Sequence, residues 1–232
     1  MSRSLLAALV AAVAVSIPAA ASAQRGPTLA FDQPCYSPGD RMGFDGAGYT
    51  PGGEVNMIFS SFVKEQFGQY DTHADPTGAI DGGLATLDPD DWLGENDWSA
   101  RIGVAASDRT RVEAGAPADQ QFGATVFTLS RFDVQVEQPN GRAPKARKPM
   151  RVTAAGFTYA RGRMLYVHYR RARRTMKTLK LGRLGGDCGD RTRTLPRALP
   201  RGLRPGRYEL VFNASKRDPQ AGPRQGERLR LR

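Results

Sequence analysis

The sequence predicts an all-β chain of two tandem β-sandwich domains behind an export signal, and three observations predict it. The 232 residues include 26 Gly and 16 Pro, which separate short runs of Val, Thr, Tyr and Phe. No long apolar stripe with the helical period of 3.6 residues occurs. A sequence unit of the first half recurs in the second half in the same order, which indicates duplication of one structural unit.

The first 23 residues are typical of a secretory signal. Arg3 precedes an apolar run from Leu5 to Ile17, and the small residues Ala21–Ala23 precede the expected cleavage before Gln24. The run is shorter than the ~20 residues of a spanning helix, so export is expected rather than membrane anchoring. No transmembrane segment is expected in the mature chain, which we place outside the cytoplasm, secreted or associated with the cell envelope.

Charge divides the chain into two halves. Residues 24–130 hold six Lys and Arg against sixteen Asp and Glu, a net charge of −10, and residues 131–232 hold 27 against seven, a net charge of +20. This division and a length that suits two domains of about 100 residues place the boundary near Ser130. Opposite charges indicate that the halves dock through complementary fields or that the basic half meets an anionic partner.

The strands expected in residues 24–130 are each bounded by Gly, Pro, Asp or Asn. In the clearest of them, Val55, Met57 and Phe59 lie on one face, as in a strand with one buried side. The two stretches TLDPDDWLGENDW and VEAGAPADQQFG are expected to be surface loops. The expected strands are 28–32, 41–46, 55–62, 80–87, 100–106 and 125–132.

The basic half begins at FDVQVEQP, where Phe132, Val134 and Val136 alternate with polar residues. RALPRGLRPG and SKRDPQAGPRQG are expected to be loops because of their Pro and Gly content. The further strands expected in this half are 150–154, 164–169, 176–181, 208–213 and 227–231.

The repeated unit is a strand, then Gly-aromatic-Thr, then a turn and a second strand. RMGFDGAGYT and PMRVTAAGFT share it, and a weaker match pairs DWSARIGV with GRYELVF. A phosphate-binding loop is disfavoured because a strand, not a helix, follows the glycines. The aligned pairs are Met42/Met150, Gly48/Gly156, Tyr49/Phe157 and Thr50/Thr158, followed by Val55/Leu165, Met57/Val167 and Phe59/Tyr169.

YSPGDRMGFDGAGYTPGGEV resembles the first strands of the immunoglobulin-like repeats in exported proteins of high-GC Gram-positive bacteria. It is also similar to the opening of the neocarzinostatin-type seven-stranded fold, an apoprotein class that holds an enediyne. HYRRARRTMKTLKLGRLGGDCG with LPRGLRPGRYELVF is similar to the second module of uncharacterised two-domain secreted proteins of those bacteria. The resemblance implies two immunoglobulin-like sandwiches, 24–130 and 131–232, and carries over no functional residue. Neither half has the Cys pair of antibody domains.

Cys35 and Cys188 are the only cysteines, one in each half, in a chain that is expected to be exported to oxidising surroundings. A bridge between them requires Cα atoms within ~7 Å. A disulfide between the domains, two unpaired thiols and pairing between chains are all open from the sequence.

Few residues suggest catalysis. The histidines are His73 and His168, and a Cys–His nucleophile would need Cys188 beside His168 with a third orienting group. Alternation with Val167 and Tyr169 predicts that His168 is an exposed strand residue. Neither Gly-x-Ser-x-Gly nor His-Glu-x-x-His occurs, so a hydrolase is the least supported function and no cofactor is expected.

One acidic run offers the oxygen ligands that calcium prefers. Its spacing does not match the EF-hand loop, and runs of this kind are usually solvated turns, so no metal site is assigned. The run comprises Asp88, Asp90, Asp91, Glu95 and Asp97.

The stretch YRRARRTMKTLKLGR places a cluster of cations at and after a hairpin expected between Tyr169 and Met176. Such a cluster attracts anionic polymers, acidic polysaccharides or lipid head groups by charge alone, and a solvated arginine-rich surface is the alternative. No specific nucleic acid is expected. The candidate anion-binding residues are Arg170, Arg171, Arg173, Arg174, Lys177 and Lys180.

These observations favour a secreted, non-enzymatic binding or structural module of the cell envelope. Its basic domain would contact anionic envelope polymers or another envelope protein. The alternative is a small-molecule carrier of neocarzinostatin-like type, which requires an open apolar cleft in the first half. The sequence leaves the oligomeric state open.

Overall fold

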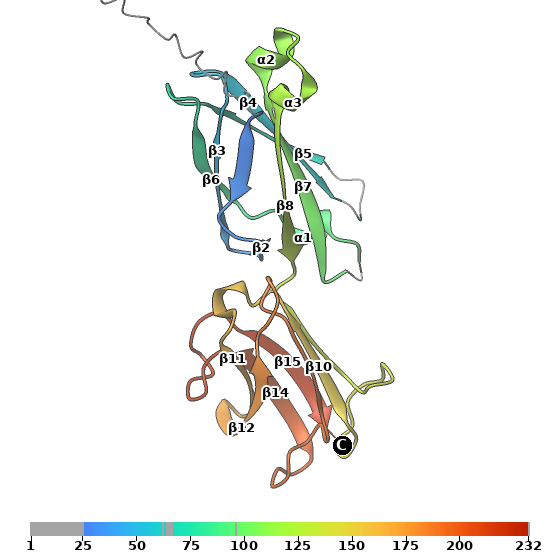
Figure 1. Cartoon of the computed structure of the whole chain (residues 1–232). Helices are drawn as coiled ribbons and strands as arrows, with labels where there is room; N and C mark the ends of the chain where they lie inside the picture. Colours follow the sequence, from blue (N-terminus) through green and yellow to red (C-terminus); the bar gives the residue numbers. More distant parts are fainter. Residues whose placement is uncertain (1–25, 62, 64–66, 96, 232) are drawn as a thin grey trace, which may run out of the picture.

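A computed structural model of the chain describes residues 26–61, 63, 67–95 and 97–231. It consists mainly of strands, and two β-sandwiches lie end to end along one axis, the first in blue to green and the second in yellow to red (Figure 1). The predicted all-β class is confirmed. The expected signal at 1–23 lies outside the described residues. Within the described part, none of the helices has the length and apolar character needed to cross a membrane.

The first sandwich consists of two sheets, with strand orders β1-β3-β6 and β2-β8-β7-β4-β5. Strands β2 and β8 are parallel, and the other paired strands are antiparallel. Three short helices lie in its connections. The elements are β1 (Thr28–Phe31), β2 (Cys35–Tyr36), β3 (Arg41–Ala47), β4 (Glu54–Ser61), β5 (Phe67–His73), β6 (Ile80–Ala85), α1 (Pro89–Trp92), β7 (Ser99–Asp108), α2 (Arg109–Glu113), α3 (Ala118–Gln121) and β8 (Phe122–Ser130).

Alternation along the strands builds the first core. Val55, Met57 and Phe59 of β4 are buried between the sheets, as predicted. Aromatic rings fill the space beside them: the Phe31 ring lies 5.0 Å from that of Phe127, which lies 5.3 Å from that of Tyr36. Burial of each such side chain stabilises the sandwich by roughly 1.5–3 kcal/mol.

The second sandwich consists of the sheets β13-β10-β9 and β12-β11-β14-β15. Its core contains Tyr169, whose hydroxyl donates to the Ala198 carbonyl at 2.9 Å. Burial raises the pKa of Tyr169, so this hydroxyl keeps its proton. The elements are β9 (Asp133–Glu137), β10 (Met150–Ala155), the 3-10 helix η1 (Thr158–Ala160), β11 (Met164–Arg171), β12 (Arg174–Arg183), β13 (Arg191–Leu195), β14 (Gly206–Asn213) and β15 (Gln225–Leu231).

The two sandwiches share one plan. Apart from β2, the order β1-β3-β6 facing β5-β4-β7-β8 corresponds strand by strand to β9-β10-β13 facing β12-β11-β14-β15. Gly48 and Gly156 occupy the same corner with φ of 85° and 72°, a conformation that favours glycine. The aromatic residue that follows each glycine, Tyr49 or Phe157, is buried in its own core. The predicted duplication therefore has a structural counterpart.

The junction between the sandwiches is short and covalently closed. The two cores have no residue in common, and the chain passes from β8 to β9 through Arg131 and Phe132. Cys35 of β2 and Cys188 of the loop before β13 form a disulfide, with Cα atoms 5.2 Å apart. Beside it, the Thr158 hydroxyl donates to the Asp40 carboxylate at 2.9 Å.

Three strands and the short helices differ from the sequence predictions. β2, β5 and β13 were missed because β2 has only two residues and the other two lie at sheet edges with polar, largely exposed side chains. Both expected surface loops contain helix. In the first, Asp88 accepts from the Asp90 amide at 2.9 Å and so caps α1, which buries Trp92.

Candidate anion-binding site

The site lies on the outer face of the sheet β12-β11-β14-β15, the face turned away from the core. In β14, Tyr208 and Leu210 point into the core, so Arg207 and Glu209 point outward. In β15, Leu231 is buried and Arg230 is exposed, which places Arg230 on the same outer face.

The strand register brings these outward residues into two rows. Glu209 stands between Arg170 of β11 and Arg228 of β15. Arg207 stands directly opposite Arg230 in the next row. Two like charges in directly opposed positions destabilise a sheet, so this face has a charge arrangement that favours a bound anion.

The hairpin between β11 and β12 forms a second side of the site. Arg171 and Arg174 pair across a two-residue turn of Ala172 and Arg173, whose φ values are 47° and 65°. Both residues lie in the left-handed region, as a type I′ turn requires. The turn places Arg173 beside Arg170, whose guanidinium donates to the Arg173 carbonyl at 3.1 Å.

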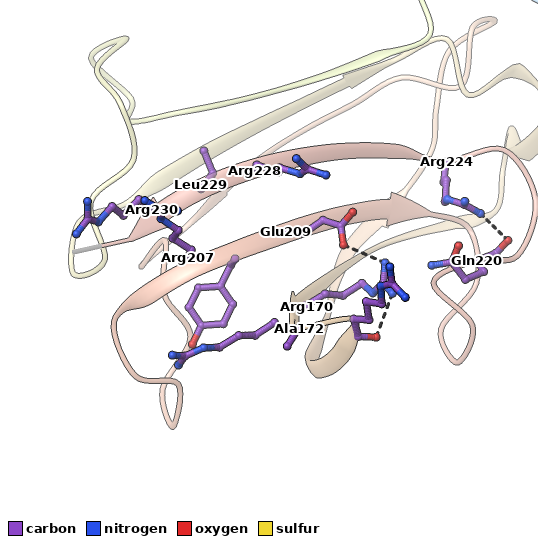
Figure 2. Close-up of a pocket in the computed structure, with 12 residues that line it drawn as sticks. Arg170, Ala172, Arg207, Glu209, Gln220, Arg224, Arg228, Leu229 and Arg230 are labelled. Carbon is purple, nitrogen blue, oxygen red and sulfur yellow. Dashed lines mark hydrogen bonds and ion pairs between the residues drawn. The ribbon is translucent and has the colours of Figure 1, made fainter.

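The loop from Asn213 to Arg224 forms the third side. Arg224 donates to the Gln220 carbonyl at 3.0 Å, which holds its guanidinium at the edge of the site (Figure 2). The loop is tied to the sheet by His168, whose Nε2 lies 3.0 Å from the Asn213 amide oxygen and 2.9 Å from the Ser215 carbonyl.

Together these elements enclose an open cavity of about 750 Å³, which we call the arginine groove. Seven arginines and one carboxylate, Glu209, line it. Figure 2 labels Glu209 and five of these arginines, which lie along the strands and on the loop. The arginines are Arg170, Arg171, Arg173, Arg207, Arg224, Arg228 and Arg230.

Arg170 and Glu209 form the floor of the groove. Their ion pair measures 3.0 Å, and the Arg170 side chain is only 12% exposed. Its Nε is buried without a hydrogen-bond partner. Arg170 is thus held in place by Glu209 and the turn, whereas the remaining arginines of the groove are exposed.

The structure separates the six candidate residues predicted from the sequence. Arg170, Arg171 and Arg173 line the groove, and Arg174 lies at the exposed end of the hairpin outside the lining. Lys177 and Lys180 line a different cavity of about 450 Å³, where the Lys177 ammonium donates to the Arg201 carbonyl at 2.8 Å.

Sequence reasoning missed Arg207, Arg224, Arg228 and Arg230. A usable signal exists for three of them, since RYEL and ERLRL alternate charged with apolar residues and so predict a charged outer face on two adjacent strands. Arg224 lies in a loop, and its position depends on the tertiary structure alone.

The prediction of an exposed His168 is wrong. The residue is fully buried, because the loop from Asn213 to Arg224 covers the outer face of β11 at this point. Its Nδ1 lies 3.0 Å from the Thr178 hydroxyl. The Cys–His pair weighed from the sequence has no thiol, since the sulfur of Cys188 is bonded to Cys35.

The acidic run does not form a metal site in the described residues. No group of three or more metal-ligating side chains gathers there or elsewhere in the part that the structure describes. Asp88 caps α1, and Asp90 pairs with Arg131 at the domain junction. This ion pair joins the acidic half to the basic half.

Neither a model of a protein family nor a curated protein matches the chain. Similar solved structures include a tetra-tandem repeat in the extending region of a large adhesion protein, with 13% identity over 89% of this chain and 49% of that chain and a TM-score of 0.31. Salmonella alpha-2-macroglobulin has 10% identity over 90% and 16%, with a TM-score of 0.34. Red sea bream transglutaminase has 12% identity over 90% and 31%, with a TM-score of 0.31. This chain spans less than half of each, and such distant likeness carries no argument about ligand or activity.

Proposed function

We propose that the protein is exported and acts, without catalysis, as a binding module of the cell envelope whose arginine groove holds an anionic polymer. The observation that supports this proposal is the lining of the groove, where seven arginines face a single carboxylate. Such a surface attracts anions at long range and releases counterions when a polyanion binds.

The charges of the two halves also orient the molecule. An acidic first half repels a polyanion, and a basic second half attracts it. The disulfide and the Thr158–Asp40 hydrogen bond hold the two sandwiches together at the junction. The first sandwich then acts as a spacer that points away from the polymer.

The small-molecule carrier lacks a supporting observation. The rings of Phe31, Tyr36 and Phe127 contact one another between the sheets of the first sandwich. These contacts pack the three rings together inside the sandwich, and we do not advance the carrier as a second function.

The test compares two variants that each remove two positive charges. Arg228→Gln/Arg230→Gln removes exposed charges from the groove, and Arg142→Gln/Arg147→Gln removes exposed charges from the loop before β10, outside the lining. Binding of the full chain to fluorescently labelled polyphosphate, polyglutamate and polyuronate is measured in about 0.1 M salt.

We expect the groove variant to weaken binding to at least one polymer about tenfold or more, because two charge-assisted contacts are worth roughly 1.5–3 kcal/mol together. The control variant should weaken it no more than about twofold. Equal losses in both variants, or no binding by the unaltered chain, would overturn the proposal.

A further inference from the structure

We infer that the groups held by the arginine groove are phosphates joined in a chain, as in a linear polyphosphate or a phosphodiester polymer. The inference rests on the proposed function and specifies the ligand of the same groove. Four features of the groove support it: the kind of cation, the number of sides, the internal carboxylate and the lack of an exposed aromatic surface.

Every cation that lines the groove is an arginine. A guanidinium offers a planar fork of donors that meets two oxygens of one oxyanion at once, whereas an ammonium acts as a point charge. The second basic cavity, which contains Lys177 and Lys180, lacks this uniform lining.

Guanidiniums reach the groove from three sides. Arg173 comes from the turn, Arg228 from the sheet and Arg224 from the loop. A phosphate carries its oxygens in a tetrahedral arrangement and accepts from donors on more than one side. A carboxylate has two oxygens in one plane, and a single guanidinium can meet both of them at once.

The protein already supplies a carboxylate to the groove. Glu209 binds Arg170 at 3.0 Å and stands opposite Arg228 in the sheet. A carboxylate of the ligand would form the same ion pair with Arg170 that Glu209 already forms. The exposed guanidiniums around the pair remain for an anion of higher charge.

A chain of phosphates fits the groove better than a single ion. Arg228 and Arg230 lie on one face of β15, two residues and therefore ~7 Å apart, and Arg207 faces Arg230 across the sheet. One phosphate reaches only part of this array. Linked phosphates bind successive arginines as intramolecular steps, which raises the overall affinity by about 10²–10⁴.

The ligand is recognised by its charges and not by rings. Tyr208 is the one aromatic residue of the lining, and it is only 4% exposed because it packs against Tyr169 in the core. Stacking of bases or sugars requires an exposed aromatic face. We therefore expect a phosphate polymer to bind without discrimination between bases.

The experiment measures the affinity of the full chain for five probes. They are inorganic phosphate, linear polyphosphate, poly(glycerol phosphate), polyglutamate and single-stranded DNA homopolymers. All polymers carry the same number of charges. We expect at least one of the two simple phosphate polymers to bind about tenfold or more tightly than polyglutamate and a hundredfold more tightly than inorganic phosphate. The polymer that binds more tightly, polyphosphate or poly(glycerol phosphate), shows whether the ligand is a linear polyphosphate or a phosphodiester polymer.

Equal or tighter binding of polyglutamate would overturn the inference and leave the proposed function intact, whereas no binding to any polymer would overturn both. DNA homopolymers that differ about tenfold or more in affinity would also overturn it, because charge recognition does not read bases. DNA bound more tightly than both simple phosphate polymers would make a nucleic acid the partner and would overturn it too.

A charge-matched pair of variants then tests the floor of the groove. Glu209→Gln removes the internal carboxylate, and Glu137→Gln removes a carboxylate that pairs with Arg151 on the other sheet. With folding checked by circular dichroism, we expect Glu209→Gln to tighten polyphosphate binding about threefold and Glu137→Gln to leave it unchanged. Unchanged or weaker binding by Glu209→Gln would show that the chain does not occupy the groove.

Discussion

At the scale of single residues, buried polar groups with several partners fix the loops to the sandwiches. Asp108, at the end of β7, is fully buried, and its carboxylate accepts from the Thr50 amide at 2.6 Å and the Thr50 hydroxyl at 2.9 Å. It also accepts from the Arg111 amide at 3.2 Å as the cap of α2. One carboxylate thus joins the repeated Gly-aromatic-Thr corner to the end of β7 and to α2.

Replacement of this carboxylate should be costly. We expect Asp108→Ala to lower the free energy of unfolding of the first domain by about 3 kcal/mol, because it leaves buried donors without an acceptor. Chemical denaturation of the full chain measures the change. Asp119→Ala, an exposed site on α3, is the control and should change stability by less than about 0.5 kcal/mol. Equal effects at both sites would contradict the role of Asp108.

At the scale of elements, the β11–β12 hairpin combines a strained turn with a functional surface. Ala172 has a φ of 47°, and neither turn residue is glycine. Side chains other than Gly, Asn and Asp tolerate this region poorly. No Asn-Gly pair marks this turn, so the flanking strands predict a hairpin without defining the type of its turn.

The strain is testable at Ala172. We expect Ala172→Asn to stabilise the second domain by several tenths of a kcal/mol, since Asn enters the left-handed region more easily. Ala172→Val should destabilise it by about 1 kcal/mol or more, because a β-branched residue is disfavoured there. Thermal unfolding monitored by circular dichroism gives both values. A stabilising Val would show that the turn has another conformation.

At the scale of the whole molecule, the duplicated plan allows a direct comparison of two equivalent positions. A Cβ on Gly156 would lie 2.1 Å from the Arg131 carbonyl oxygen at the domain junction. A Cβ on Gly48 would meet nothing closer than 3.6 Å. Both glycines have positive φ, so replacement by Ala has the same conformational cost at each site. The two sites differ only in the steric clash of the added Cβ.

We therefore expect Gly156→Ala to destabilise the protein by about 2 kcal/mol more than Gly48→Ala, or to move the second sandwich relative to the first. Denaturation measures the stability, and small-angle scattering measures the arrangement of the domains. Equal effects of the two variants on both readouts would contradict the close approach at the junction.

The disulfide between the sandwiches carries a further prediction. Digestion under non-reducing conditions should release the peptide of Cys35 joined to that of Cys188, and two free thiols in the native protein would refute it. Cys35→Ser/Cys188→Ser should broaden the distribution of domain orientations in small-angle scattering, while each sandwich keeps its own core. An unchanged scattering profile would show that the Thr158–Asp40 contact is sufficient.

The sequence by itself determined the all-β class, the duplicated unit and the main strands, because alternation and glycine-rich corners are local and are present in both copies. It also located the basic hairpin. It did not predict β5 and β13, whose exposed side chains give no apolar alternation.

Only the tertiary structure decided which charges share a site. Lys177 follows Arg173 by four residues, yet it lines another cavity. Arg228 is distant in sequence from Arg173, yet it lies beside Glu209 in the same groove. Pairing of β11, β14 and β15 determines these neighbours, and it depends on burial of the inner faces of the strands. The covering of His168 and the approach of Cys35 to Cys188 likewise depend on contacts between distant segments.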